Sequence, residues 1–258
     1  MAALQMTGHI IAGIQTYVYG LDENPSGPVV IFLHGLRGAA QNSLKYCRDL
    51  AGRGYIALAF DQRNHGQRTV DLSVNQSGSD NYPVNTYGIY SGTAHDVSTI
   101  IDFLPLVLNI STESIGVCGF SLGAHASFVA AVIDERIKAV VPICGTGDRK
   151  AMLKQRFLAT GGDASEFERS FPARMAAVLK KYDPVHNLHA LKDRALCMIN
   201  GGRDSIVPPD TNRCLWEKLV PLYNDQSKLV HSVYPDAEHE VTPEMWDECV
   251  EWFNRFLS

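Results

Sequence analysis

Short apolar runs alternate with segments of helical period along most of this chain. The run 29–33 has five consecutive apolar residues, as expected of a strand buried on both faces. Similar runs lie at 55–60, 114–120, 137–144, 195–200 and 228–234, an extended segment lies at 9–19, and helical periods lie at 41–53, 94–108, 126–132, 211–222 and 243–256. Strands that alternate with helices predict βαβ units. We therefore expect an α/β fold, with a mostly parallel central sheet and helices on both of its faces.

The alternation is interrupted in two places. Between 146 and 191 the strands stop, and two helix-like stretches lie there, at 148–158 and 167–181. We predict a small helical cap at 146–191, inserted into a core formed by 1–145 and 192–258. Residues 69–91 have no strong period and are rich in Asn, Ser, Gly and Tyr, which predicts a long surface excursion of the kind that often contributes to a substrate site.

Composition narrows the class of protein. With 258 residues, 45% of them hydrophobic and 20% charged, the chain can bury a sizeable globular core. The formal net charge is -5, so the chain lacks the excess of Lys and Arg that nucleic-acid-binding proteins carry, and a nucleic-acid partner is not expected. We expect no secretory leader and no membrane span, because no charged-then-apolar leader pattern and no run of spanning length occurs. The six cysteines are scattered without a Cys-x-x-Cys pair, which favours a reducing, cytoplasmic location.

The strand-like run 114–120 leads into Gly119-Phe120-Ser121-Leu122-Gly123 and then into a helical pattern. A serine at a sharp strand-to-helix turn presents its hydroxyl above the sheet, and the flanking glycines let the neighbouring backbones pass closely. We predict that Ser121 is a nucleophile. The backbone N–H groups of Leu122 and of Leu36, which follows His34-Gly35 at another strand end, are the predicted donors of an oxyanion hole.

A serine hydroxyl needs a general base, and the chain has nine histidines. His239 is the predicted base, because it lies in the loop between the last strand and the last helix and can reach over the sheet edge. His125 lies on the helix after the nucleophile and is expected to be a packed histidine that points elsewhere. His34 is expected to be a structural hydrogen-bonding residue, and His65 to shape its loop.

The base in turn needs an orienting acid. Asp204 is the predicted acid, because it directly follows the penultimate strand and begins a tight turn. Asp210, a candidate helix N-cap, is a rival, as are Asp236 and Glu238. The preferred set in chain order is Ser, Asp, His.

Several motifs in register carry a resemblance to a known superfamily. They are Leu33-His34-Gly35, Gly119-Phe120-Ser121-Leu122-Gly123, Gly201-x-x-Asp204-x-x-Val207-Pro208 and Glu238-His239. Together they resemble the α/β-hydrolase superfamily, whose catalytic residues follow the order Ser, Asp, His. Within it the chain is most similar to small dienelactone-hydrolase-like and prolyl-oligopeptidase-like carboxylesterases, from about Ile10 to Phe256. The loop Asp61-x-Arg63-x-His65-Gly66 resembles the superfamily's Asp-x-Arg-Gly-x-Gly.

Two departures from the family pattern stand out. Asn64 occupies a position where glycine is common, so the shape of that loop is expected to differ. The nucleophile is serine and not cysteine, which argues against a true dienelactone hydrolase.

His34, Gly35 and Phe120 are the predicted substrate contacts.

The resemblance implies a serine hydrolase that cleaves a carboxylic ester of a small molecule, lactones and thioesters included, through an acyl-enzyme. Three alternatives stay open: a peptidase or amidase, an acyl-transfer cyclase on the same residues, and a non-catalytic ligand-binding protein. No metal or other cofactor is expected, since there is no His-Glu-x-x-His, no cysteine cluster and no phosphate-binding glycine loop. The sequence carries no signal for an oligomeric state.

Overall fold

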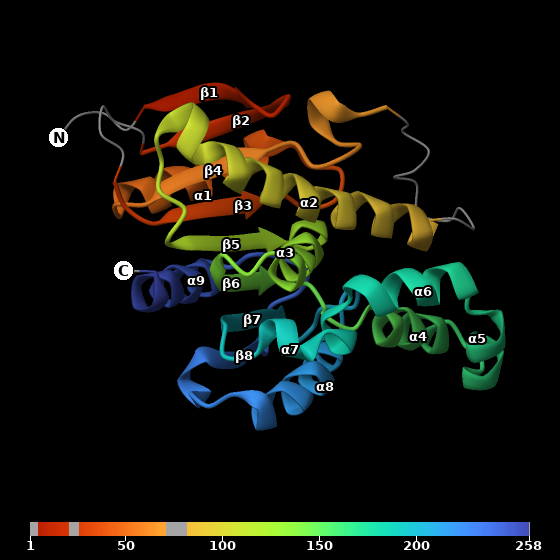
Figure 1. Ribbon diagram of the computed structural model, residues 1–258. Helices are drawn as coiled ribbons and strands as arrows, with labels where there is room; N and C mark the ends of the chain where they lie inside the picture. Colours follow the sequence, from red (N-terminus) through yellow and green to blue (C-terminus); the bar gives the residue numbers. More distant parts are fainter. Residues whose placement is uncertain (1–4, 21–25, 71–81, 258) are drawn as a thin grey trace.

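The computed structural model describes residues 5–20, 26–70 and 82–257, with side chains in the last range described from residue 86. Eight strands form one sheet in the order β1-β2-β4-β3-β5-β6-β7-β8 (Figure 1). The strands are β1 (Met6–Ile11), β2 (Ile14–Tyr19), β3 (Val29–Leu33), β4 (Ile56–Phe60), β5 (Ile115–Phe120), β6 (Ile137–Ile143), β7 (Ala195–Gly201) and β8 (Leu229–Tyr234). Only the β1–β2 and β2–β4 pairings are antiparallel among those described. The predicted mostly parallel α/β sheet is confirmed.

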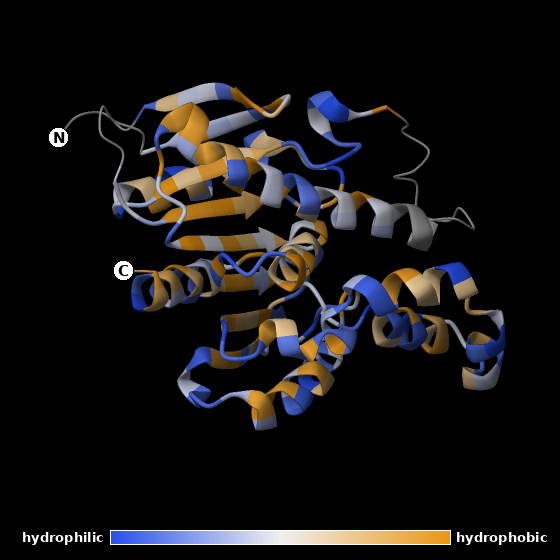
Figure 2. Ribbon diagram, in the orientation of Figure 1, coloured by the Kyte–Doolittle hydropathy of each residue, from blue (hydrophilic) through white to orange (hydrophobic). Residues whose placement is uncertain are grey.

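Helices cover both faces of this sheet, and each face has its own apolar core. On one face α1 (Ala40–Gly52) and α9 (Pro243–Phe256) pack against alternate residues of the strands. On the other face lie α2 (Tyr82–Leu108), α3 (Leu122–Ile133), α7 (Leu188–Leu191) and α8 (Asp210–Leu219). Figure 2 shows apolar strands at the centre and helices with one apolar side, the pattern that buries both faces of a parallel sheet.

The register of the central strands brings their carboxyl ends together. Leu33 on β3 pairs with Gly119 on β5, and Phe120 on β5 pairs with Ile143 on β6. The loops that follow these strands therefore leave the sheet side by side, which is where open α/β sheets form their sites.

Three helices extend beyond this edge of the sheet (Figure 1): α4 (Arg149–Ala159), α5 (Ala164–Ser170) and α6 (Ala173–Tyr182). They fall within the predicted cap at 146–191, whose separation from the core as a domain stays a prediction. Four short 3-10 turns complete the described elements: η1 (Gly66–Arg68), η3 (Pro184–His186), η4 (Val220–Leu222) and η5 (Gln226–Lys228). No helix within the described ranges combines the length and the apolar character needed to cross a membrane.

Two elements differ from the sequence-based expectation because turns divide them. The extended segment predicted at 9–19 is a hairpin, with Ala12 and Gly13 at φ 49° and 80° between β1 and β2. The helix predicted at 167–181 is two helices, α5 and α6, joined through Phe171 and Pro172 in extended conformations. Proline has no backbone N–H and clashes with the preceding turn of a helix, which explains the break.

The start of α2 was also predicted wrongly, at 94 instead of Tyr82. Residues 82–91 of the predicted excursion are helical, and residues 71–81 lie outside the described residues. Gly88 and Gly92 are weak helix formers, so local propensity does not indicate this part of the helix. Tertiary packing stabilises it: Tyr87 and Tyr90 are each 1% exposed, with their ring centroids 4.6 Å apart.

Candidate active site

Ser121 lies at the turn between β5 and α3, in a backbone conformation that non-glycine residues rarely adopt (φ 54°, ψ -110°). Its N–H donates to the carbonyl oxygen of Ile143 at 2.9 Å, which fixes the turn to the neighbouring strand. Close approach explains both flanking glycines. A Cβ on Gly119 would lie 2.6 Å from the Gly123 carbonyl, and a Cβ on Gly123 would lie 2.0 Å from the carbonyl oxygen of Leu33.

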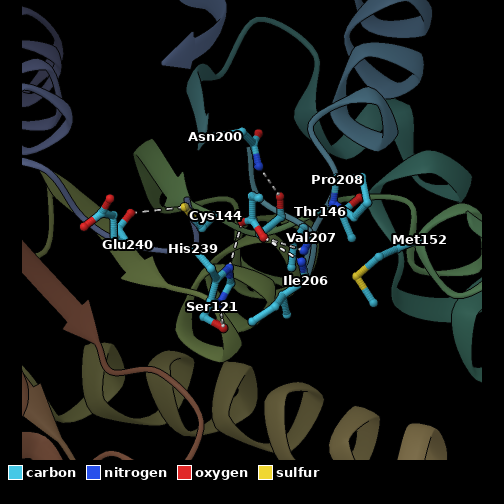
Figure 3. A network of polar contacts seen from close by, with 12 residues as sticks. Ser121, Cys144, Thr146, Met152, Asn200, Ile206, Val207, Pro208, His239 and Glu240 are labelled. Atoms are coloured by element: carbon cyan, nitrogen blue, oxygen red, sulfur yellow. Dashed lines mark hydrogen bonds and ion pairs between the residues drawn. The ribbon is translucent and has the colours of Figure 1, made fainter. Parts of the chain in front are cut away.

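Three predicted side chains lie in a hydrogen-bonded series, and Figure 3 labels two of them, Ser121 and His239. Ser121 Oγ is 2.8 Å from His239 Nε2, and His239 Nδ1 is 2.7 Å from Asp204 Oδ2. The other carboxylate oxygen of Asp204 accepts the backbone N–H groups of Ile206 and Val207, both at 2.8 Å. The Asp204 side chain is fully buried, whereas that of His239 is 17% exposed. This arrangement can orient the imidazole and place an acceptor nitrogen on the serine hydroxyl.

The rival acids lie elsewhere. Asp236 forms an exposed ion pair with Arg203, and its own side chain is 86% exposed. Asp210 forms an exposed ion pair with Arg213, and Glu238 is exposed beside His239 in the sequence. Burial and the bond to His239 Nδ1 distinguish Asp204 from these three.

The two predicted oxyanion residues lie at the same cavity as the serine. Leu36 follows β3 and Leu122 begins α3, and both line a cavity of about 60 Å³ together with Ser121. Ile206 and Val207 form another part of its wall. The first N–H groups of a helix have no partner within the helix, so the N–H of Leu122 is available to a negative charge developing here.

His34 supports the loop that carries Leu36. Its Nδ1 donates to the Gly35 carbonyl oxygen at 2.8 Å, and its Nε2 accepts the N–H of Gln62 at 3.1 Å. The side-chain amide of Gln62 in turn donates to the His34 carbonyl oxygen. Burial lowers the pKa of His34 to about 4. As expected, His34 acts as a structural hydrogen-bonding residue, and both of its ring nitrogens are engaged.

The loop after β4 is tied to the same region. Asp61 accepts the N–H of Ala40 at 2.7 Å and that of Gln67 at 2.8 Å, and so links α1 to the turn η1. Asn64 has φ 58°, the left-handed conformation that glycine favours and asparagine tolerates. Asn64 thus adopts a glycine-like backbone conformation, and the expectation that the loop differs in shape from its relatives stays a prediction. His65 Nδ1 donates to the Arg63 carbonyl oxygen, as expected of a loop-shaping residue.

A second cavity, of about 430 Å³, lies at the start of the loop after β3. His34, Gly35 and Phe120, the three predicted substrate contacts, line it together with Tyr46. The ring of Phe120 also lies 5.0 Å from that of His239, between centroids. Phe120 therefore lies next to both this cavity and the imidazole ring.

His125 is packed, as expected, but it does not point away from the site: its side chain lines the cavity beside the nucleophile. Arg149 Nη1 is 3.3 Å from His125 Nε2, and Arg149 Nη2 donates to Thr86 Oγ1 at 3.4 Å. Because arginine can only donate, Nε2 accepts, and Nδ1 carries the proton. Nδ1 then donates to the Thr146 carbonyl oxygen at 3.1 Å and cannot also accept the Thr146 N–H, which lies 3.3 Å away. Burial, reinforced by Arg149, lowers the pKa of His125 to about 3.

Cys144, directly after β6, lies next to Asp204 and His239. Its Sγ donates to the Glu240 carbonyl oxygen at 3.3 Å, a contact drawn in Figure 3. One ligand atom each of Cys144, Asp204 and His239 lies within 4.8 Å of the others, which is the spacing of a possible metal site in the described part of the chain. Burial raises the pKa of the Cys144 thiol to about 12, so the thiolate that a metal requires is disfavoured, and the other two groups already bind each other.

Sequence reasoning missed Arg149 and a buried amide pair. Asn212 donates to Asn200 Oδ1 at 2.8 Å and to the Gly145 carbonyl oxygen at 2.7 Å, and accepts the Gly147 N–H at 3.1 Å. These bonds fix the start of the 146–191 segment to β7 and α8. Single asparagines in a strand and in a helix give no sequence signal for such pairing, which depends on tertiary contact.

Comparisons with known proteins identify the family to which the chain belongs. The model of the Dienelactone hydrolase family matches residues 14–257. The Bacillus subtilis (strain 168) protein YitV, provisionally named an esterase, is 22% identical over 98% of this chain and 100% of its own length. The structure of TT1662 from Thermus thermophilus superposes with a TM-score of 0.80 at 22% identity, covering 99% of this chain and 98% of its own. The Pyrococcus furiosus esterase Pf2001 superposes with a TM-score of 0.68 at 20% identity, covering 99% of this chain and 94% of its own. The chain belongs to the Dienelactone hydrolase family and is a carboxylic ester hydrolase.

Proposed function

We propose that this protein hydrolyses a carboxylic ester of a small molecule, lactones and thioesters included, through an acyl-enzyme on Ser121. The observation that carries the proposal is the series of two short hydrogen bonds, 2.7 Å from Asp204 to His239 and 2.8 Å from His239 to Ser121. Membership of the family supports ester chemistry, and the strained turn at the serine supports its role as nucleophile.

In the first half-reaction Ser121 Oγ attacks the carbonyl carbon and His239 Nε2 takes the hydroxyl proton. The carbonyl electron pair moves to oxygen, and the N–H groups of Leu36 and Leu122 stabilise the resulting oxyanion. When the oxyanion collapses, the bond to the leaving oxygen breaks and His239 gives its proton to that oxygen. Asp204 holds the imidazole and stabilises its charged form.

In the second half-reaction a water molecule takes the place of the alcohol. His239 removes one proton from the water, whose oxygen attacks the acyl carbon. The second tetrahedral intermediate collapses with transfer of the proton back to Ser121 Oγ. The products are a carboxylic acid and the free enzyme.

We further propose His34, Gly35 and Phe120 as substrate contacts, on the strength of the 430 Å³ cavity that they line. His34 would contribute ring surface, because both of its nitrogens bind backbone groups. The cytoplasmic location stays a prediction. The free state of all six cysteines is consistent with it.

The test is covalent labelling of the intact protein with a fluorophosphonate, read by mass spectrometry. We expect one adduct on the wild type and none on Ser121→Ala, and hydrolysis of short-chain nitrophenyl esters that both Ser121→Ala and His239→Ala abolish. Thermal unfolding of each variant shows whether the fold is kept. Labelling that persists in Ser121→Ala, or an unlabelled wild type that binds esters without cleaving them, would refute the proposal and favour a ligand-binding protein.

A further inference from the structure

Aromatic rings make up much of the wall of the 430 Å³ cavity at the start of the loop after β3. Four of its lining residues carry rings: Phe32, His34, Tyr46 and Phe120. Three others come from the start of α1 and have exposed polar side chains: Gln41, Asn42 and Lys45. No Asp or Glu lies among the lining residues that the structure describes. The less exposed part of the wall therefore offers ring surface to a ligand.

The rings of this wall are packed against one another. Tyr46 on α1 stacks on Phe32 of β3, with the ring centroids 4.5 Å apart and the planes at 12°. Trp246 on α9 lies 4.6 Å from Tyr46 and 5.9 Å from Phe32, between centroids. Phe32 itself is 2% exposed. Because these rings are already held in place, a ligand that contacts them immobilises few further side chains, which favours binding.

Several polar atoms of the lining already have partners within the protein. Both ring nitrogens of His34 bond backbone groups, and burial lowers the pKa of this histidine to about 4, so its ring is neutral at pH 7. The carbonyl oxygen of Gly35 accepts the N–H of Gly38 at 3.0 Å as well as the bond from His34. Asn42 Oδ1 accepts the N–H of Ala39 at 2.7 Å. A ligand group here therefore gains more from ring contact than from hydrogen bonds.

The cavity also borders the reacting groups. Gly35 directly precedes Leu36, a proposed oxyanion donor. Phe120 directly precedes Ser121, and its ring lies 5.0 Å from that of His239, between centroids. A Cβ on Gly35 would lie 3.0 Å from Cδ1 of Phe120, so these two lining residues are in close contact. A group joined by a few bonds to an ester carbonyl at Ser121 is therefore within reach of the cavity.

From these observations we infer that the substrate is an ester with an aromatic ring a few bonds from the scissile carbonyl, and that this ring binds against Tyr46 and Phe120. The inference rests on the proposed hydrolysis at Ser121 and on the proposed substrate contacts at this cavity. It adds the substrate class, an aryl-bearing ester, and names Tyr46 as a specificity-determining residue. Offset and edge-to-face contacts between aromatic rings are stronger than burial alone accounts for, so they distinguish a phenyl ring from a saturated ring of similar size.

The test compares esters that differ only in the saturation of one ring. Benzyl acetate and cyclohexylmethyl acetate place that ring on the alcohol half, and methyl phenylacetate and methyl cyclohexylacetate place it on the acyl half. The kcat/KM of each ester is divided by its rate of alkaline hydrolysis, which removes differences in intrinsic reactivity. For at least one pair we expect the wild type to favour the phenyl ester by about 5- to 50-fold, the range of two aromatic contacts.

Tyr46→Leu removes one ring from the wall and keeps an apolar side chain. It should lower the phenyl-to-cyclohexyl ratio by about 2- to 10-fold, the range of one aromatic contact. Phe120→Leu should lower the ratio by a similar factor, and carries the test if Tyr46→Leu does not fold. Tyr182→Leu is the matched control and should leave the ratio unchanged, because Tyr182 is also a half-buried tyrosine on a helix but lines neither cavity. A merely structural role for Tyr46 would lower turnover of both esters alike.

A second readout does not need turnover. Trp246 contacts the ring of Tyr46, so a ligand in the cavity should change the tryptophan fluorescence. We expect a saturable change when the aryl ester of the preferred pair is titrated into Ser121→Ala, and a binding constant for its cyclohexyl partner that is weaker by about the same factor as the kinetic ratio. Trp246→Phe in the same background should remove the change.

A ratio within about twofold of unity for both pairs would overturn the inference. A preference for the phenyl ester that Tyr46→Leu and Phe120→Leu both leave intact would overturn it as well, as would equal binding of the aryl ester and its cyclohexyl partner to Ser121→Ala. These results leave fluorophosphonate labelling of Ser121 intact, whereas failure of the labelling itself would refute the proposed function.

Discussion

Replacing Asp204 by asparagine tests whether the buried carboxylate sets the protonation of His239. The asparagine oxygen can keep the two backbone bonds to Ile206 and Val207, both 2.8 Å in the native structure. Its amide group then faces His239 Nδ1 in place of the oxygen at 2.7 Å. An amide N–H only donates, so Nδ1 must accept and the ring proton moves to Nε2.

That proton then points at the Ser121 hydroxyl, 2.8 Å away, and the imidazole can no longer take the serine proton. We expect kcat/KM on p-nitrophenyl acetate to fall about 10³- to 10⁴-fold, or about 4–5.5 kcal/mol of transition-state stabilisation. The rate of fluorophosphonate labelling should fall in parallel. The free energy of unfolding should change by less than about 1.5 kcal/mol, because shape and the backbone bonds are kept.

Asp236→Asn is the matched control, since Asp236 lies in the neighbouring loop with its side chain 86% exposed. It should leave kcat/KM within about twofold of the wild type. Activity of Asp204→Asn within tenfold of the wild type would refute the reasoning. An equal loss in Asp236→Asn would show that the orienting acid is misassigned.

Three further perturbations act on the scaffold of the site. Gly123→Ala places a Cβ 2.0 Å from the Leu33 carbonyl oxygen and should destabilise the fold by more than about 3 kcal/mol in urea denaturation. Asp61→Ala leaves two backbone N–H groups without their acceptor and should cost about 2–4 kcal/mol, measured in the same way. Burial lowers the pKa of His34 to about 4 and that of His125 to about 3 from the usual 6.5. Below pH 6.5 these two histidines are protonated in the unfolded chain but stay neutral in the folded protein until the pH approaches their lowered pKa values. The unfolded state therefore binds more protons, and the free energy of unfolding should fall on acidification, by about 2 kcal/mol for each histidine between pH 7 and pH 5.

These expectations have clear contrary outcomes. A wild-type-like Gly123→Ala would mean that the turn is not closely packed, and a neutral Asp61→Ala would mean that water replaces its bonds. His34→Gln should flatten part of the acid limb of the stability curve. An unchanged limb would show that this histidine is not the group that titrates.

Local patterns in the sequence predicted the sheet, its two covered faces and the position of Ser121. This works because apolar runs such as 29–33 need no information beyond their own residues to indicate a buried strand. Parallel strands also bring their carboxyl ends to one edge, so chain order alone placed the loops of Asp204 and His239 near the serine.

The first part of α2 could not be predicted from local sequence patterns. Residues 82–93 include two glycines and several β-branched or aromatic side chains, which are weak helix formers. The helix continues there because Tyr87 and Tyr90 are buried against each other and beneath the cap segment. Burial of a face, not propensity, determines such a segment.

The choice among acidic residues and the character of the cavity were likewise decided by tertiary structure. Asp204 is distinguished from Asp236 by its burial and by its hydrogen bond to His239, and a short sequence motif predicts neither property. Arg149 meets His125 across 24 positions of the chain. A local pattern reports which backbone conformation a segment prefers. Burial, ion pairing and the shape of a cavity depend on which distant segments come into contact, and only the folded chain determines that.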